Sequence, residues 1–168
     1  HMFHDCSSLK EADLSNFNVE KVLNMSHLFT NCQKIKTINM NSLQTKNVLD
    51  MSKIFSNCES LTNLYISKIN TEQIKDFSHM FSECKSLESL DISSFNTKSA
   101  ENMSYMFKGC IYLSSFKFNF DTKNVKDMTS MFQYCRKLTS LDVSKFDTRK
   151  VISMSFMFDE CNALKNLN

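Results

Sequence analysis

The sequence of 168 residues has one glycine, no proline and no tryptophan. Phosphate-cradling loops need several glycines for close backbone approach, so nucleotide-binding motifs of that kind are excluded. No run of 18 or more apolar residues is present, which excludes a membrane-spanning helix in this segment. The 20 basic and 18 acidic residues nearly balance. Because nonspecific nucleic-acid binding needs a concentrated positive field, nucleic acid is not an expected partner.

What the sequence does contain is an internal repeat from end to end. Cysteines recur every 26 residues, except in one unit of 25. Such a period is typical of stacked coils that bury their apolar faces only against neighbouring coils. We predict that residues 1–168 form a single solenoid fragment of about six repeats, excised from a longer array. The cysteines that mark the units are Cys6, Cys32, Cys58, Cys84, Cys110, Cys135 and Cys161.

Two periodicities occur within each unit. Leu87, Leu90 and Ile92 alternate inward, which predicts a short strand that pairs with its equivalents in one parallel sheet. From Met103 to Cys110 the apolar spacing is i, i+3, i+4, i+7, which predicts a short helical segment. One phenylalanine per unit is expected to stack on the next along the axis. These are Phe3, Phe29, Phe55, Phe81, Phe107, Phe132 and Phe158.

Polar residues at fixed slots predict the turns. Asn96 precedes Thr97, and such Asn or Asp side chains can fix a turn without glycine. Ser104 is a candidate helix cap, although Asn102 competes for that role. The unit between Cys110 and Cys135 lacks one residue in the segment 118–120. We expect a local irregularity there, of the kind that loops commonly tolerate.

The unit from Cys84 to Cys110 reads C-x-x-L-x-x-L-x-I-x-x-F-N-T-x-x-x-x-x-M-S-x-M-F-x-x-C. This motif resembles the repeats of BspA-like leucine-rich-repeat surface proteins, especially the 25- to 26-residue type of mycoplasma lipoproteins. The resemblance covers the whole chain and implies an α/β repeat solenoid: a right-handed, leucine-rich-repeat-like coil stack with one parallel β-sheet and short helical segments. It also implies a place at the cell surface or outside the cell, and adhesion or host interaction. It carries no catalytic or ligand-binding residue onto this sequence.

Outward slots of the predicted strands are the candidate binding site. Stacked strands would hold them in a rigid grid about 4.8 Å apart, with Tyr65 as an aromatic anchor. The candidate partner-binding residues are Asn39, Asn63, Tyr65, Ser89, Asp91, Lys117 and Asp142.

Other polar columns have simpler interpretations. The cysteines are each a coil apart, so we expect buried, inert thiols and no metal site. His27 and His79 share a slot two coils apart, too far for one metal ion, and are expected to be solvated. Basic residues in one turn column form a stripe that we expect to be a solvated edge: Lys98, Lys123 and Arg149.

Two functions remain open. The first is a non-catalytic module that binds an extracellular or host protein, or a glycan, beside adjacent repeats of the full-length chain. The second is a structural spacer rod without a specific ligand. Catalytic motifs are absent, so no enzyme activity, catalytic residue or cofactor is predicted. No membrane insertion by this fragment is predicted.

Overall fold

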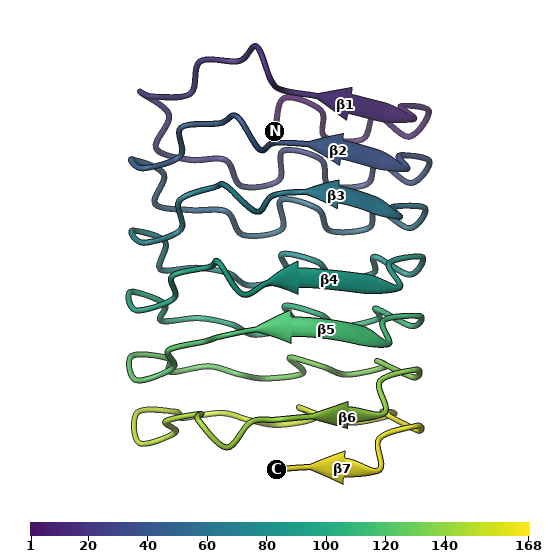
Figure 1. Ribbon diagram of the computed structural model, residues 1–168, viewed down its shortest axis with the longest axis vertical. Coiled ribbons are helices and arrows are strands. Elements are labelled where there is room, and N and C mark those ends of the chain that lie inside the picture. The colour runs from purple at the N-terminus through teal and green to yellow at the C-terminus, as the bar shows by residue number, and fades with distance from the viewer.

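A computed structural model describes residues 1–168 as a stack of coils with one short strand in each (Figure 1). The strands follow one another down the stack in sequence order and lie along one side of it. The predicted solenoid is therefore confirmed. Its strands are β1 (Glu11–Asp13), β2 (Thr37–Asn39), β3 (Asn63–Tyr65), β4 (Ser89–Ile92), β5 (Ser115–Phe118), β6 (Ser140–Leu141) and β7 (Asn166–Leu167).

The strands pair in parallel but do not form the single sheet that the sequence predicts. They form three separate pieces, β1-β2-β3, β4-β5 and β6-β7. The register within each piece aligns equivalent slots, so that Asn39 lies opposite Tyr65 and Asp91 opposite Lys117. Pairing is interrupted between β3 and β4, and again between β5 and β6.

No helix is present, and the prediction of short helical segments is wrong. Consequently the structure contains no helix able to cross a membrane. The segment expected to be helical consists of successive turns, in which the N–H of Cys110 donates to the carbonyl of Phe107 three residues earlier. Turns that bond three residues apart bring residues i and i+3 to one side, much as a helix does. The apolar spacing therefore fits both structures.

Left-handed backbone conformations are what prevent a helix here. Two residues in each full coil have positive φ, such as Tyr105 (58°) and Gly109 (74°), and twelve such residues are not glycine. Each costs roughly 1–2 kcal/mol in a non-glycine residue. The cost is offset because these N–H groups donate to the next coil, as Tyr105 does to Thr129 and Gly109 to Gln133, both at 2.8 Å.

These turns form a continuous structure on the other side of each coil, which we call the turn row; residues 50–58 are one example. One position in the turn row bridges in parallel through six successive coils. An Asn or Asp holds this position in five of them, and its Oδ1 accepts the N–H two residues later, as Asn102 does from Ser104 at 3.0 Å. The bridged residues are Asn24, Asp50, Asp76, Asn102, Asp127 and Ser153.

The predicted phenylalanine stack is confirmed. Successive rings lie with centroids 5.2 to 6.2 Å apart and planes within 19° of parallel, from Phe3 to Phe158. The five interior rings have no exposed surface. Stacked, buried rings of this kind run through the core and tie every coil to the next.

A second internal column consists of threonines that are only 1% exposed: Thr45, Thr71, Thr97 and Thr122. Each hydroxyl bonds twice to the backbone of the residue that precedes the equivalent threonine in the next coil. The Thr97 hydroxyl donates to the carbonyl of Asp121 at 3.1 Å and accepts the N–H of Asp121 at 2.8 Å. Because buried backbone groups must be paired, this column fixes the spacing of the coils at the edge between strand and turn row.

The cysteines form a third column. Six of the seven are buried, and only Cys6 is exposed. Each buried thiol donates to the carbonyl of a phenylalanine, as Cys84 does to Phe55 at 3.2 Å. Burial raises the pKa of Cys84 well above its usual value, which keeps the thiol protonated and able to donate. The predicted burial is confirmed.

Candidate functional site

The outer face of the strands seen in Figure 1 is called the strand face here, and the residues predicted to contact a partner lie in or directly after these strands. Tyr65 keeps 48% of its surface exposed, a large fraction for an aromatic side chain. Asn39 differs from the others because it is half-buried and donates to the Asp13 carboxylate at 3.2 Å. The exposed candidates are Asn63, Tyr65, Ser89, Asp91, Lys117 and Asp142.

Several of these residues also hold the backbone. The Asp91 carboxylate accepts the Ser93 hydroxyl at 2.7 Å and the Ser93 N–H at 3.1 Å. These bonds, from the hydroxyl first, lower the pKa of Asp91. Asp142 accepts the Ser144 N–H at 2.9 Å, and the Ser144 side chain and backbone lower the pKa of Asp142 too. Such a bond fixes the turn that follows the strand. Asp91 and Asp142 are therefore structural residues as well as candidate contacts.

The hydrogen bond that the Asn or Asp side chain accepts from the N–H two residues later, which we call the turn bond, has a consequence for strand pairing. The residue after the Asn or Asp donates its N–H to the next coil: Met40, after Asn39, donates to the Tyr65 carbonyl at 2.9 Å. Ile66, which follows Tyr65, donates to no backbone carbonyl. Tyr65 has no side-chain carbonyl or carboxylate with which to fix the turn.

Strand pairing follows this rule along the whole stack. The strands that contain Asp13, Asn39 or Asp91 pair with the next strand, and so does β6, which Asp142 follows directly. The two strands that carry Tyr65 or Lys117 instead do not, and the two interruptions of the sheet follow them. The two breaks in strand pairing therefore lie where Tyr65 or Lys117 replaces the Asn or Asp that usually holds this slot of the repeat.

A hollow of about 300 Å³ lies at the first break, and we call it the β3/β4 hollow. Four predicted contacts meet there, Asn63 and Tyr65 from β3 with Ser89 and Asp91 from β4. The other lining residues are Asn41, Thr62, Leu64, Ile66, Ser67 and Leu90. The rim is polar and Tyr65 supplies an exposed ring.

A second hollow, of about 350 Å³, lies at the other break, and we call it the β5/β6 hollow. Lys117 and Asp142 line it, so six of the seven predicted residues lie at the two hollows and only Asn39 lies outside them. Sequence reasoning missed its aromatic lining. The sequence did hold one signal of this lining, the unit of 25 residues, because its shortened segment forms part of the wall of the β5/β6 hollow. The other residues that line this hollow, none of which was among the predicted contacts, are Phe116, Phe118, Asn119, Phe120, Ser140, Leu141, Lys145 and Phe146.

The basic stripe at the turn edge is neutralised within the chain. Lys98 pairs with Glu72, and Lys123 with Asp121 at 3.2 Å. Hydrogen bonds from Arg149 lower the pKa of Asp147 to about 2. With its charges paired to neighbouring carboxylates, the stripe offers little net field to an anionic partner.

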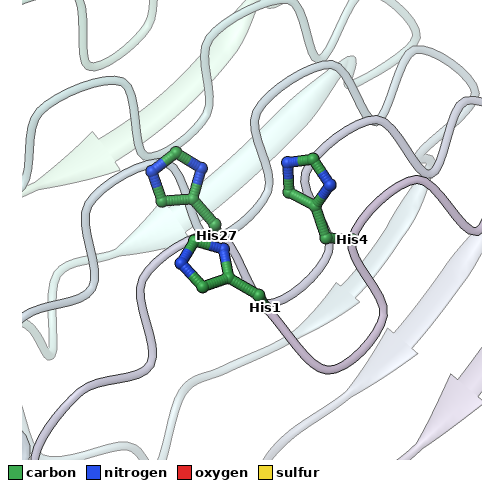
Figure 2. Close-up of side chains that lie close together, drawn as sticks. All are labelled: His1, His4 and His27. Carbon is green, nitrogen blue, oxygen red and sulfur yellow. The ribbon is translucent and has the colours of Figure 1, made fainter.

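Three histidine rings gather at the first coils (Figure 2). Ring nitrogens of His1, His4 and His27 all lie within 4.8 Å of one another, and Asp5 bonds to His4 Nδ1 at 2.9 Å. Burial, followed by the Lys53 charge, lowers the pKa of His27, which favours the neutral imidazole that a metal needs. Three imidazoles can bind Zn²⁺. The proximity of the three rings is the only observation that points to a metal, and we assign the cluster no function.

The structure also alters the expectation for His79. Its ring is half-buried and stacks on Tyr105 with centroids 4.5 Å apart. Burial, more than the nearby Lys53 charge, lowers the pKa of His79. The expectation of a solvated side chain in this slot therefore holds only in part for His79, which is half-buried against the ring of Tyr105 in the next coil.

Comparison with known proteins supports the fold. A leucine-rich repeat protein from Eubacterium ventriosum superposes with a TM-score of 0.53 at 16% identity, over 90% of this chain and 43% of that protein. A T. pallidum leucine-rich repeat protein gives 0.46 at 18% identity, over 94% of this chain and 72% of the other. A leucine-rich cell surface protein from Faecalibacterium prausnitzii gives 0.39 at 16% identity, over 99% and 61%. At 16% identity the likeness to the Eubacterium ventriosum protein concerns the fold alone, and the other two superpositions, with TM-scores below 0.5, carry no argument.

A search of curated proteins finds no match to the sequence. The family comparison is decisive, because one family model matches residues 1–116 and again residues 86–168, which together span the chain. This confirms the mycoplasma-type resemblance of the repeat motif. The chain belongs to the family described as Mycoplasma protein of unknown function, DUF285.

Proposed function

We propose that this chain is a non-catalytic binding module that holds a protein or glycan partner on its strand face. The observation that carries the proposal is the coincidence of three features. The repeat departs from Asn or Asp at Tyr65 and at Lys117, the sheet is interrupted after each, and a hollow opens at each interruption.

A rigid backbone supports the proposal energetically. The phenylalanine, threonine and cysteine columns and the turn row hold every coil to its neighbours. A partner that docks on such a surface orders few groups of the solenoid, and ordering groups is a large cost of association. Exposed Tyr65 is an amphipathic aromatic side chain of the type that dominates binding energies at interfaces.

The location of this binding is part of the proposal. The family resemblance supports a place at the cell surface or outside the cell, where the partner would be an extracellular or host protein or a glycan. The chain spans 43% of the length of the Eubacterium ventriosum protein, so neighbouring repeats can contribute to the same surface.

A spacer rod remains the second candidate, and the paired charges along the basic stripe favour it. A rod needs only internal bonds and a solvated exterior. It predicts that surface substitutions have no effect on binding, whereas the binding module predicts strong effects at the two breaks.

The test restores the repeat at both departures with the double variant Tyr65→Asn and Lys117→Asn. Each asparagine can form the turn bond that Asn39 makes to the Asn41 N–H at 3.2 Å, so the fold should be kept. Binding would be measured against purified extracellular-matrix proteins and a glycan array. We expect at least a tenfold loss of affinity for any ligand found.

The matched control changes the basic stripe instead, with Lys98→Gln and Lys123→Gln. We expect less than a twofold effect on the same ligand. A loss with this control but not with the strand-face variant would place the site on the stripe. No ligand in either panel, or equal binding by all three proteins, would favour the spacer rod.

A further inference from the structure

The β5/β6 hollow differs in character from the β3/β4 hollow. Its walls carry four phenylalanine rings, and Phe118 contacts the other three: Phe116 at 4.8 Å, Phe120 at 5.0 Å and Phe146 at 6.0 Å between centroids. Phe120 is buried, whereas the other three rings are half-buried. An apolar surface that is half-exposed within a hollow is a place where a partner's apolar group can be desolvated.

The missing residue of the short unit accounts for this exposure. In five units the strand is followed by a turn in which a residue donates to the carbonyl three residues earlier, as Phe95 does to Ile92 at 3.0 Å. The short unit lacks the residue equivalent to Ser94, and Phe120 donates to no such carbonyl. Phe118 stands where the neighbouring unit has buried Ile92. The shortened segment thus keeps the chain extended and leaves a larger ring at the wall.

Charge at the rim favours an anionic group. Lys117 and Lys145 both line the hollow, against the single carboxylate of Asp142. That carboxylate already accepts the Ser144 N–H at 2.9 Å. Lys145 has no carboxylate within salt-bridge distance, and Lys117 reaches Asp91 only at 3.7 Å, with both side chains largely exposed. Weak, solvated pairing of this kind leaves the two ammonium groups available to a partner.

The size of the hollow limits the occupant. At about 350 Å³ it lies at the lower end of the roughly 300–1,000 Å³ typical of ligand pockets. One large side chain with its flanking residues fits this range, whereas an extended oligosaccharide would contact mainly the rim. Four phenylalanines and Leu141 make up half of the lining, and these five side chains offer no hydrogen bond to a sugar.

From the aromatic wall and the two lysines, we infer that the β5/β6 hollow takes an aromatic or aliphatic side chain of an acidic peptide segment in the partner protein. This inference rests on the proposed function and narrows its partner to a protein at this hollow. The apolar group fills the space among Phe116, Phe118 and Phe146, and its acidic neighbours lie beside Lys117 and Lys145.

The experiment uses short peptides as probes and the NMR amide signals of residues 116–120 and 140–146 as the readout. The peptides are acetyl-Asp-Phe-Glu-amide, acetyl-Lys-Phe-Lys-amide and acetyl-Asp-Ala-Glu-amide. We expect the first to shift these signals with at least fivefold higher affinity than either other peptide. Added salt should reduce this difference, because exposed charges are screened.

Three variants locate the effect. Lys145→Glu should lower the affinity for the acidic phenylalanine peptide at least fivefold. Lys68→Glu changes a lysine in the same slot of an earlier coil and should leave it unchanged. Insertion of one serine between Asn119 and Phe120 restores a 26-residue unit and should abolish the shifts, while the circular dichroism spectrum shows that the fold remains.

Equal affinity for acidic and basic peptides, or equal effects of Lys145→Glu and Lys68→Glu, would overturn the charge argument. Signal shifts with maltotriose but with none of the peptides would overturn the peptide assignment in favour of a glycan. The proposed function fails separately: it fails if the Tyr65→Asn, Lys117→Asn variant keeps full affinity for a macromolecular ligand. If that variant loses affinity while no peptide binds, the further inference alone fails.

Discussion

The turn row and the strand face respond differently to changes in the repeat. In the turn row the bridged position runs through six coils without a gap, although the residue three positions later varies from His27 to Tyr105 and Ser130. On the strand face, replacement of Asn or Asp by Tyr65 or Lys117 coincides with a break in pairing. The turn row is supported by N–H groups that donate to the next coil at alternate residues, whereas a strand of two to four residues depends on far fewer such bonds.

This difference indicates where such a repeat can vary. Substitutions on the strand face alter local pairing and open hollows, but the inner columns keep the coils in place. A solenoid built this way can change its binding surface without losing its fold, in keeping with the modular stability of repeat proteins.

The largest effect should come from the inner columns that both sides share. Phe81→Ala removes a fully buried ring from the middle of the stack and should cost about 3–5 kcal/mol in the free energy of unfolding. Urea denaturation measures it. Phe17→Ala, at a ring that is 41% exposed, is the control and should cost much less. Equal losses in the free energy of unfolding at Phe81 and Phe17 would show that the phenylalanine stack is not the source of the stability.

The threonine column should come next. Thr97→Val keeps the shape of the side chain but leaves the N–H and carbonyl of Asp121 without their hydroxyl partner. Leaving buried groups unpaired typically costs about 1–3 kcal/mol. Thr62→Val, on an exposed threonine, is the matched control. A thermal melt in which both variants behave alike would show that the column is dispensable.

Alkaline pH should weaken the interior through the cysteines. Burial raises the pKa of Cys32 to about 11 and that of Cys84 well above the usual 9.0. From about pH 9 the unfolded chain loses thiol protons that the folded chain keeps, so stability is present below pH 9 and falls above it. The slope is about 1.4 kcal/mol per pH unit for each thiol.

The measurement is urea denaturation with reductant at pH 8 and pH 10. The Cys84→Ala variant has one titrating thiol fewer, so its stability should fall less between the two pH values, whatever its stability at pH 8. An identical fall in the variant and the parent protein would show that Cys84 is not protected in the folded state.

The smallest effect on stability should come from the strand face. Tyr65→Asn restores the usual residue of the slot and should change the free energy of unfolding by no more than about 0.5 kcal/mol, as is typical at the surface. Asp91→Ala should destabilise more than Tyr65→Asn, because it removes the acceptor of both Ser93 bonds. A larger loss with Tyr65→Asn would mean that the ring, and not the turn bond, organises this part of the sheet.

Much of the fold could be predicted from the sequence because the repeat shows which slots face inward. The stacked phenylalanines, the buried cysteines and the outward slots of the strands all follow from one alignment of the units. The prediction of a helix was wrong because the apolar spacing of Met103, Met106 and Cys110 fits successive turns equally well. Residues with a left-handed backbone conformation are usually glycine or asparagine, but His27, Lys53 and Tyr105 hold such positions here.

The site was predictable only in part. Alternation along the strands identified Tyr65, Asp91 and Lys117 as exposed. Alternation did not reveal that strand pairing follows the hydrogen bond that an Asn or Asp side chain accepts from the N–H two residues later, and that this bond is missing at Tyr65 and Lys117. The short unit marked the position of the β5/β6 hollow, but its opening depends on how Phe118 and Phe146 pack in three dimensions.

Amide hydrogen exchange at two equivalent positions tests the central claim, that the strand face is interrupted beside Tyr65 while the turn row is continuous. The N–H of Met40 donates to the next coil at 2.9 Å, and that of Ile66 does not. We predict that Ile66 exchanges at least tenfold faster than Met40, whereas Phe55 and Phe81 in the turn row are protected alike. Equal protection of Met40 and Ile66 would contradict the break, and with it the origin of the hollows.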